Sequence, residues 1–263
     1  ASIVAISVIS NIEGNAQTIS ENTVYNIETS ATGKIELYGI FYDGPEAVEA
    51  VIPPPAGAAV YNGDGSDLQN FVNRNAGKVI YLPPGLYTIS DILWFNKAPN
   101  TKLQGAGMWH TQIHFSSGTG GLWSSRSNVS YADLYLTTER NSREYNYHAI
   151  RGAYDGGATI ERVWTEHFEC GAWISQFDNN GIPFSDGLII SHCRFRNSFA
   201  DGVNFSKGTV NCVVEHCSFR SNGDDDMAVW CADGMECINN TFRFSTSENV
   251  WRASGASLYG GKD

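Results

Sequence analysis

His192-Cys-Arg-Phe-Arg-Asn197 opens a pattern that returns as His216-Cys-Ser-Phe-Arg-Ser221 and, with its aromatic residue displaced by one place, as Asn240-Thr-Phe-Arg-Phe244. The second copy follows the first at a spacing of 24 (216 − 192), and the third follows at the same spacing (240 − 216). A period in the twenties is typical of solenoids, whose coils bury their apolar faces only against one another. Because the copies are strand-rich and lack a long helical stretch, the repeat predicts an all-β parallel β-helix.

Two earlier segments extend the same pattern. Ala132-Asp-Leu-Tyr-Leu136 and Glu161-Arg-Val-Trp-Thr165 fit looser coils with longer loops between them. Further towards the N-terminus, Ser66 or Asp67 can cap a short amphipathic helix. The apolar side of this helix is formed by three residues: Leu68, Phe71 and Val72.

A strand, a proline-glycine corner and a second strand follow this helix, in the stretch Gly77-Lys-Val-Ile-Tyr-Leu-Pro-Pro-Gly-Leu-Tyr-Thr-Ile89. The helix with this stretch is similar to the N-terminal cap of right-handed parallel β-helices. Such a cap is needed because an uncovered first coil would expose a sheet edge. We therefore expect a right-handed solenoid that begins near residue 60.

The chain divides into three predicted parts. Short strand-like runs separated by turn residues in residues 1–51 predict the C-terminal part of a β-sandwich or accessory β domain, because about fifty residues rarely make an independent one. Residues 52–59 are expected to be a linker, since the three consecutive prolines of Ile52-Pro-Pro-Pro-Ala-Gly57 exclude a central strand. Residues 60–263 form the predicted β-helix.

Composition narrows the possible partners. The 263 residues carry a formal net charge of −11, which disfavours nucleic acid and acidic membrane surfaces and leaves neutral polysaccharide open. The sequence contains no stretch of 18 or more apolar residues, so no membrane-spanning helix is expected. The apolar start, Ala1 to Ser10, lacks a basic region and a cleavage motif, so we interpret it as a strand rather than a signal peptide.

All six cysteines lie in the second half of the chain, and none forms a CxxC pair or a zinc-type cluster with histidine. Disulfides of an exported protein and buried free thiols inside a solenoid both remain open interpretations. The cysteines are Cys170, Cys193, Cys212, Cys217, Cys231 and Cys237.

The repeat register brings acidic side chains together. Aligning His192 with His216 places Asp201 over Asp225 (225 − 201 = 24), one strand spacing of about 4.8 Å away. Asp224 is the chain neighbour of Asp225. Stacked acids repel one another, so a coil built only for stability would avoid them. A catalytic cluster is one interpretation; a calcium site or a solvated acidic turn is the other.

The cap helix, the Leu-Pro-Pro-Gly corner and the Asp201-Gly202 and Gly223-Asp224-Asp225 motifs, backed by Val214-Glu-His-Cys217, together resemble glycoside hydrolase family 87. The resemblance covers roughly Val60 to Asp263. That family contains bacterial α-1,3-glucanases and mycodextranases. It implies a secreted, endo-acting hydrolase of α-1,3-glucosidic bonds in α-1,3-glucan or nigeran.

The resemblance also implies roles for the acidic residues. Asp224 corresponds to the general acid, and Asp201 and Asp225 correspond to the bases that activate water in an inverting mechanism. Asp226 has no counterpart and is interpreted as a turn residue. We further expect four substrate contacts near the cluster: Trp230, Asn204, Lys207 and His216. For His216, a structural ladder with His192 is the competing interpretation.

The remaining expectations concern alternatives and partners. An α-1,6-dextranase-like hydrolase, a non-catalytic carbohydrate-binding solenoid and a β-helix polysaccharide lyase stay open, although a lyase would need a basic residue at the central stack. The sequence predicts no required cofactor and no metal ligands, while a structural calcium ion is compatible with its acidic turns. Because no capping element follows Tyr259, we expect the polysaccharide and a further part of the same polypeptide as partners.

Overall fold

The computed structural model describes residues 4–9, 36–41, 50–145, 147–154, 156–175 and 185–262. The chain forms two compact units, Ala1–Glu49 and Ala50–Asp263. In the first unit, β1 (Val4–Ile9) pairs antiparallel with β2 (Glu36–Phe41), so the strand expected at the start of the chain is confirmed. The expected sandwich lies mostly outside the described residues and stays a prediction. Within the described residues, no helix is long and apolar enough to cross a membrane.

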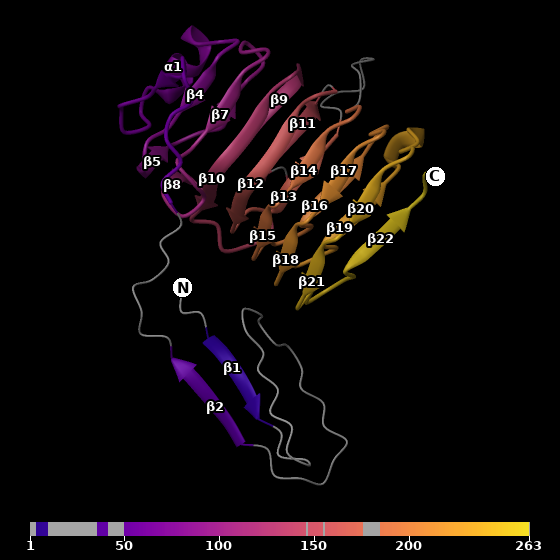
Figure 1. The fold of residues 1–263 in the computed structure, drawn as a ribbon. Helices are drawn as coiled ribbons and strands as arrows, with labels where there is room; N and C mark the ends of the chain where they lie inside the picture. Colours follow the sequence, from indigo (N-terminus) through magenta and orange to yellow (C-terminus); the bar gives the residue numbers. More distant parts are fainter. Residues whose placement is uncertain are drawn as a thin grey trace. The chain divides into compact units, whose positions relative to one another are not determined.

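The second unit is a parallel β-solenoid of about six turns (Figure 1). Its described strands pair in parallel from coil to coil, which confirms the predicted β-helix. One sheet has the order β22-β19-β16-β13-β11-β9-β6. Its strands are β6 (Leu93–Trp94), β9 (Leu122–Ser127), β11 (His148–Tyr154), β13 (Cys170–Ile174), β16 (Val203–Ser206), β19 (Met227–Trp230) and β22 (Ala256–Tyr259).

The other sheet runs along two sides of the coils and shares its two longest strands, β10 and β12, between both sides. Its first side contains β3 (Ala59–Val60), β4 (Val79–Tyr81), β7 (Lys102–Gln104), β10 (Ser130–Thr138), β12 (Thr159–Glu166), β14 (Ile189–Ser191), β17 (Val213–Glu215) and β20 (Thr241–Arg243). Its second side adds β5 (Gly85–Ile89), β8 (Thr111–Phe115), β15 (Arg194–Arg196), β18 (Ser218–Arg220) and β21 (Thr246–Glu248). The chain therefore changes direction at three corners in each complete coil.

The helix and the proline-glycine corner that cover the first coil of the solenoid form as predicted. Helix α1 (Leu68–Arg74) follows Asp67, with Leu68 and Val72 buried. The Asp67 side chain does not cap the helix and instead accepts a hydrogen bond of 2.6 Å from the Tyr61 hydroxyl. The Leu82-Pro-Pro-Gly85 stretch makes the corner between β4 and β5.

The coil length varies more than the repeat predicts. Arg194 pairs with Ser218 and Val203 with Met227, so the spacing of 24 (218 − 194 and 227 − 203) is confirmed for these coils. The next coil is longer, because Ser218 pairs with Thr246 at a spacing of 28 (246 − 218). The predicted alignment of Asn240 with His216 is therefore wrong. The extra residues include a short 3₁₀ helix, η1 (Ala232–Gly234), which follows β19.

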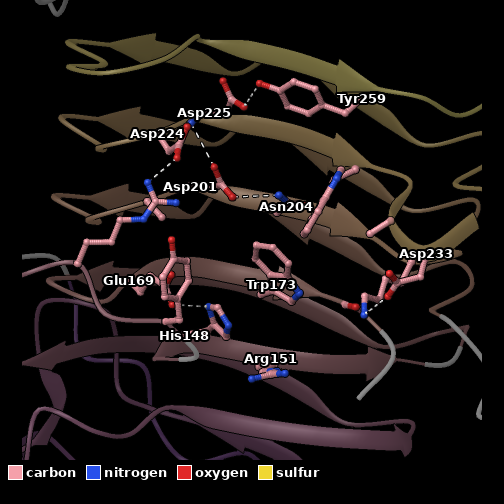
Figure 2. A pocket seen from close by; sticks show the side chains of 17 residues that line it. His148, Arg151, Glu169, Trp173, Asp201, Asn204, Asp224, Asp225, Asp233 and Tyr259 are labelled. Atoms are coloured by element: carbon pink, nitrogen blue, oxygen red, sulfur yellow. Dashed lines mark hydrogen bonds and ion pairs between the residues drawn. The ribbon is translucent and has the colours of Figure 1, made fainter. Parts of the chain in front are cut away.

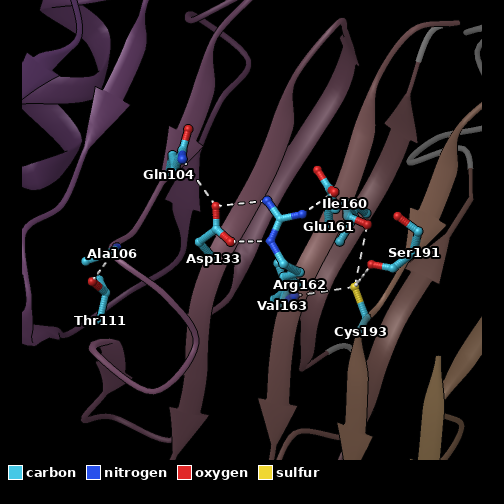
Figure 3. Close-up of polar contacts among 10 residues, drawn as sticks. All are labelled: Gln104, Ala106, Thr111, Asp133, Ile160, Glu161, Arg162, Val163, Ser191 and Cys193. Atoms are coloured by element: carbon cyan, nitrogen blue, oxygen red, sulfur yellow. Dashed lines mark hydrogen bonds and ion pairs between the residues drawn. The ribbon is translucent and has the colours of Figure 1, made fainter. Parts of the chain in front are cut away.

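The earlier coils confirm the looser spacing, since Ala132 pairs with Glu161 (161 − 132 = 29). Buried polar contacts tie these coils together (Figure 3). Asp133 is fully buried and accepts hydrogen bonds from Arg162 Nε at 2.5 Å and from Gln104 Nε2 at 3.2 Å. Because three consecutive coils contribute one residue each, this cluster fixes their register.

The interior is filled by stacked apolar side chains. Phe195 and Phe219 stack with ring centroids 5.1 Å apart on neighbouring coils. The six cysteines are free thiols, and all except the half-buried Cys231 are buried. The sequence left disulfides and buried free thiols open, and the structure agrees with the free thiols.

Residues of the expected linker contact the solenoid. The Ile52 backbone N–H donates to the Ala106 carbonyl at 2.9 Å, and the Ile52 carbonyl accepts a 2.5 Å bond from the Tyr81 hydroxyl. Ala59 is already part of β3, which pairs with β4. The compact solenoid unit thus begins at Ala50, ahead of the residue 60 that the cap pattern predicts.

Candidate active site

The three aspartates lie at one corner of the solenoid, where the chain leaves the second side and enters the seven-stranded sheet. Asp201 lies shortly before the start of β16, and Asp224 and Asp225 hold the same place before β19. Glycine is required beside Asp201, because a Cβ on Gly202 would overlap the Phe219 ring. The repeated corner therefore brings the acids of two coils together.

The acids form a cluster inside a groove of about 710 Å³. One carboxylate oxygen from each aspartate lies within 4.8 Å of the others, as the spacing of the repeat predicts (Figure 2). Charged and titratable side chains line the groove: Arg143, His148, Arg151, Lys207, Glu169, Asp201, Asp224, Asp225 and Asp233. Its aromatic and smaller lining residues are Tyr145, Trp173, Trp230, Tyr259, Ser175, Ala200, Asn204 and Ala232.

Asp201 has a strongly perturbed carboxyl. Its pKa is raised from 3.8 to about 7, chiefly by burial and also by the neighbouring Asp224 and Asp225 charges, against a lowering by the Asn204 hydrogen bond. Asn204 Nδ2 donates to Asp201 Oδ2 at 2.9 Å, and the Asp225 N–H donates to Oδ1 at 3.2 Å. The cluster therefore holds a proton below about pH 7.

Asp225 is held by the coil that follows it. Its Oδ1 accepts hydrogen bonds from the Ser254 N–H at 3.0 Å and the Ser257 hydroxyl at 2.7 Å. Its Oδ2 accepts a 2.9 Å bond from the Tyr259 hydroxyl (Figure 2). Three donors therefore fix the orientation of this carboxylate at the edge of the groove, an arrangement that suits a base.

Asp224 has a different environment. Its Oδ2 pairs with Arg143 Nη1 at 2.7 Å and lies 3.7 Å from Arg252 Nη2. Its side chain is 27% exposed, whereas Asp201 and Asp225 are buried. Of the three aspartates, Asp224 is thus the one that is most exposed to solvent in the groove.

Aromatic rings lie next to the acids. Trp173 and Trp230 meet edge to face with centroids 5.7 Å apart, and His148 stacks on Trp173 at 5.2 Å. Burial lowers the pKa of His148 well below its usual value, so this ring is neutral. Flat apolar faces beside hydrogen-bonding groups are suited to sugar rings.

Three of the four expected substrate contacts line the groove: Trp230, Asn204 and Lys207. The Lys207 ammonium pairs with Asp233 at 2.6 Å, so these two residues form part of the groove wall. The expectation for His216 is wrong, because its ring stacks between His192 and Phe244, each at 5.2 Å, after β17 on the other sheet. The structural ladder is therefore confirmed.

Asp226 also lies outside the groove. It is fully buried and accepts hydrogen bonds from Asn222 at 2.7 Å and from the Ser247 hydroxyl at 2.5 Å. The alternation of side chains along the chain turns Asp226 inwards while Asp225 faces the groove. It has a structural role, in agreement with the prediction that it is not a catalyst.

Sequence reasoning missed several groove residues. Arg143 lies 81 residues from Asp224, and no pattern in the sequence connects them. Tyr259 could have been found, because it lies in the coil after Trp230 and pairs with it in register. Trp173 was not missed: the sequence places it near the acidic coils, and the structure pairs it in register with Asn204.

The cluster also resembles a cation site in its spacing, because carboxylate oxygens are ligands for calcium. Arg143 and Arg252 already supply positive charge at Asp224 and would repel a divalent ion there. The three aspartates therefore stay candidate catalytic groups, and a structural calcium ion stays a prediction without assigned ligands.

Known proteins resemble this chain in sequence and in fold. A family model described as "Alpha-1,3-glucanase catalytic domain D2" matches residues 62–263. The crystal structure of the Agl-KA catalytic domain is 31% identical, with a TM-score of 0.75 over 86% of this chain and 43% of that chain. A comparison with curated proteins found no match.

Two further solved structures match at 25% identity. The catalytic unit of the thermostable GH87 alpha-1,3-glucanase from Streptomyces thermodiastaticus strain HF3-3 has a TM-score of 0.71, over 81% of this chain and 40% of that chain. A GH87 alpha-1,3-glucanase catalytic domain in complex with nigerose has a TM-score of 0.69, over 87% of this chain and 41% of that one.

A parallel β-solenoid with clustered carboxylates in an aromatic groove defines the class of β-helical carbohydrate-active domains. Since the family model matches most of its length, the chain belongs to glycoside hydrolase family 87, within the alpha-1,3-glucanase catalytic region. The resemblance inferred from the sequence is thereby confirmed. The chain spans less than half of the alpha-1,3-glucanase structures named above, for example 43% of the Agl-KA catalytic domain.

Proposed function

We propose that the protein containing this chain is a secreted, endo-acting glycoside hydrolase that cleaves α-1,3-glucosidic bonds in α-1,3-glucan or nigeran. The observation that carries the proposal is the cluster of Asp201, Asp224 and Asp225, within 4.8 Å of one another in the groove of a family 87 solenoid. Titles of GH87 alpha-1,3-glucanase structures name complexes with nigerose and with tetrasaccharides, which supports an α-glucan ligand.

The spacing of the three aspartates supports their roles. GH87 alpha-1,3-glucanase catalytic domains were solved with alanine in place of each of three aspartates, whose positions differ by 23 and by 1. Asp201, Asp224 and Asp225 are separated by the same intervals (224 − 201 and 225 − 224). Replacing acids singly is a usual way to trap a substrate complex, so the agreement favours these residues as the catalytic ones.

In the proposed reaction, Asp224 protonates the glycosidic oxygen as the bond to the anomeric carbon breaks. Asp225, fixed by three donors, and Asp201 orient the attacking water and take its proton. Because the cluster holds one proton below about pH 7, the acid role requires that proton to be on Asp224 when substrate is bound. The proposed steps need no cofactor.

The stereochemical outcome is the point on which distance and resemblance disagree. The resemblance implies inversion, whereas inverting enzymes typically separate their carboxyl groups by about 6.5–9.5 Å. The nearest oxygens of this cluster lie within 4.8 Å. We retain inversion, because three carboxylates that share a water do not form the two-residue geometry on which that distance rule rests. Proton NMR of the first product decides it: release of the β-anomer supports inversion, and release of the α-anomer contradicts it.

The substrate is tested by incubating the protein with α-1,3-glucan, nigeran, dextran and polygalacturonate, followed by mass analysis of the products. We expect oligosaccharides from the first two polymers. Products from dextran alone would favour an α-1,6 hydrolase, and unsaturated products from polygalacturonate would favour a lyase. Binding to glucan without any released sugar would indicate a non-catalytic binding protein and would contradict the proposal.

The acid is tested with Asp224→Asn. The substitution removes the transferable proton but keeps the shape of the side chain, so turnover should fall by about 10²–10⁴-fold while oligosaccharide binding persists. Calorimetric titration with a glucan oligosaccharide measures the binding. Turnover within about tenfold of the wild-type rate would assign the acid role to another residue.

A further inference from the structure

A distant segment supplies the main contact of the proposed acid. Arg143 lies in the connection between β10 and β11, three coils before Asp224 in the repeat, and its Nη1 donates to Asp224 Oδ2 at 2.7 Å. The two residues are 81 positions apart in the chain. Their side chains are 32% and 27% exposed, so the contact lies at the open side of the groove.

The other two aspartates do not depend on such a segment. Asp201 is held by Asn204 of its own coil and by the Asp225 backbone of the next coil. Asp225 is held by donors of the following coil, including the Tyr259 hydroxyl. Within the described part of the chain, the side-chain partners of Asp224 are the two arginines, of which only Arg143 is within hydrogen-bond distance. The orientation of Asp224 therefore depends on where Arg143 is placed.

The segment that carries Arg143 is anchored to the solenoid by Arg140. The Arg140 guanidinium donates two hydrogen bonds, of 3.0 and 2.7 Å, to the Gly118 carbonyl. It also pairs with Glu144 at 3.1 Å and stacks over the Tyr147 ring at 3.8 Å. With only 6% of its side chain exposed, Arg140 fixes both sides of Arg143 to the coils. Arg143 is thus presented to the groove from a segment that Arg140 ties to the solenoid.

The geometry points to Arg143 as a positioning residue: the anchored β10–β11 connection orients the Asp224 carboxylate for the proposed proton transfer. This inference rests on the proposed function, since it assigns Asp224 the acid role. With Oδ2 held by Arg143, the carboxylate has one orientation, and its other oxygen carries the proton to the glycosidic oxygen. Four charged groups surround Asp224: Arg143, Arg252, Asp201 and Asp225. The two arginines supply the positive charge next to the three carboxyl groups.

The test compares Arg143→Ala and Arg143→Lys with the wild-type protein. We expect Arg143→Ala to lower kcat by about 10²-fold with KM within about threefold, because a misplaced acid affects the chemical step more than binding. Arg143→Lys should retain an intermediate rate, since a single ammonium can still pair with Oδ2. Added guanidinium ion, below denaturing concentrations, should restore part of the rate of Arg143→Ala but not of Asp224→Asn. Rescue of this kind distinguishes positioning from a merely structural role.

Arg220→Ala is the matched control. Arg220 is a half-exposed arginine of β18 that lies 3.7 Å from Glu248 and outside the groove, so its loss should leave kcat unchanged. The inference is overturned if Arg143→Ala keeps its kcat, if only KM rises, or if guanidinium does not restore the rate of a variant with the melting temperature of the wild type. If Arg143→Ala fails to fold, an intermediate rate for Arg143→Lys supports the inference and an unchanged one refutes it.

A measurement without turnover separates this inference from the proposed function. The Arg143 charge lowers the pKa of Asp201, so Arg143→Ala should raise it further above about 7, as followed by carboxyl carbon NMR across pH. A wild-type protein that cleaves no glucan, together with this shift, would refute the proposed function and keep the placement of Arg143 at the cluster. An active wild type whose Arg143→Ala variant changes neither rate nor titration would refute the inference alone.

Discussion

The three carboxylates of the groove have the same chemistry and different surroundings. Asp201 is desolvated, Asp225 is held by three hydrogen-bond donors, and Asp224 is paired with a guanidinium. Differences of this kind are how neighbouring acids come to serve as acid and base in one reaction. At this scale, function depends on what each aspartate contacts more than on its presence.

Burial of Asp201 predicts a pH-dependent contribution to stability. Its pKa is raised from 3.8 to about 7 in the folded protein, so between these values the folded chain binds a proton that the unfolded chain releases. Its contribution is most favourable below about pH 4 and is lost as the pH rises through about 7. Asp201→Asn should therefore raise the free energy of unfolding at pH 8, by at most about 4 kcal/mol, with little gain at pH 4.

Denaturant unfolding of both proteins at pH 4 and pH 8 measures this effect. Asp64 is exposed and serves as the control, since Asp64→Asn should show no gain at pH 8. An equal stability difference between wild type and Asp201→Asn at both pH values would contradict the desolvation of Asp201.

The strand and its corner are the elements that place the acids. Phe219 of β18 is fully buried, stacks on Phe195 and lies directly against Gly202, next to Asp201. Because the backbone of the acidic corner rests on this ring, the core and the candidate active site share one contact. Packing inside a coil and the position of Asp201 are therefore coupled.

Phe219→Ala tests this coupling. Removing a fully buried ring should lower the free energy of unfolding by about 3–5 kcal/mol and lower the turnover as the corner relaxes into the cavity. Phe244→Ala removes an aromatic residue of the next coil that is 72% exposed, so it should change stability by less than about 1 kcal/mol. Denaturant unfolding and turnover measure both variants; similar losses for the two would contradict the role of the buried stack.

The whole solenoid behaves as a stack in which each coil contacts its neighbours. Its cohesion comes from parallel pairing, from buried ladders such as Phe195–Phe219 and from buried thiols instead of cross-links. In such a stack, stability is roughly a sum over coils and the interfaces between them. The groove crosses these interfaces, so it exists only when adjacent coils are formed.

The thiols provide a test of the stack as a whole. Burial raises the pKa of several of them, well above the usual value for Cys193, which makes them poor nucleophiles. In the native protein we expect a thiol reagent to modify the half-buried Cys231 and to leave the five buried cysteines unmodified. All six should react after unfolding without reductant; fewer than six would show that disulfides are present.

The sequence by itself determined the features that follow from the stacking of neighbouring coils. The repeat period predicted the parallel solenoid and the placement of Asp201 over Asp225, because register in a stack follows directly from spacing. The cap helix and the proline-glycine corner were also local enough to predict. The same logic failed at Asn240, where η1 lengthens the coil and no period signals the insertion.

The tertiary structure alone decided the environment of the acids. The contact of Arg143 with Asp224 spans 81 residues through a loop, and loops carry no period from which a contact could be calculated. Burial of Asp201, which raises its pKa, is a property of the packed corner and not of the residue type. The placement of His216 on the other sheet follows from the corner that precedes it, since one change of direction moves a side chain to a different side of the coil.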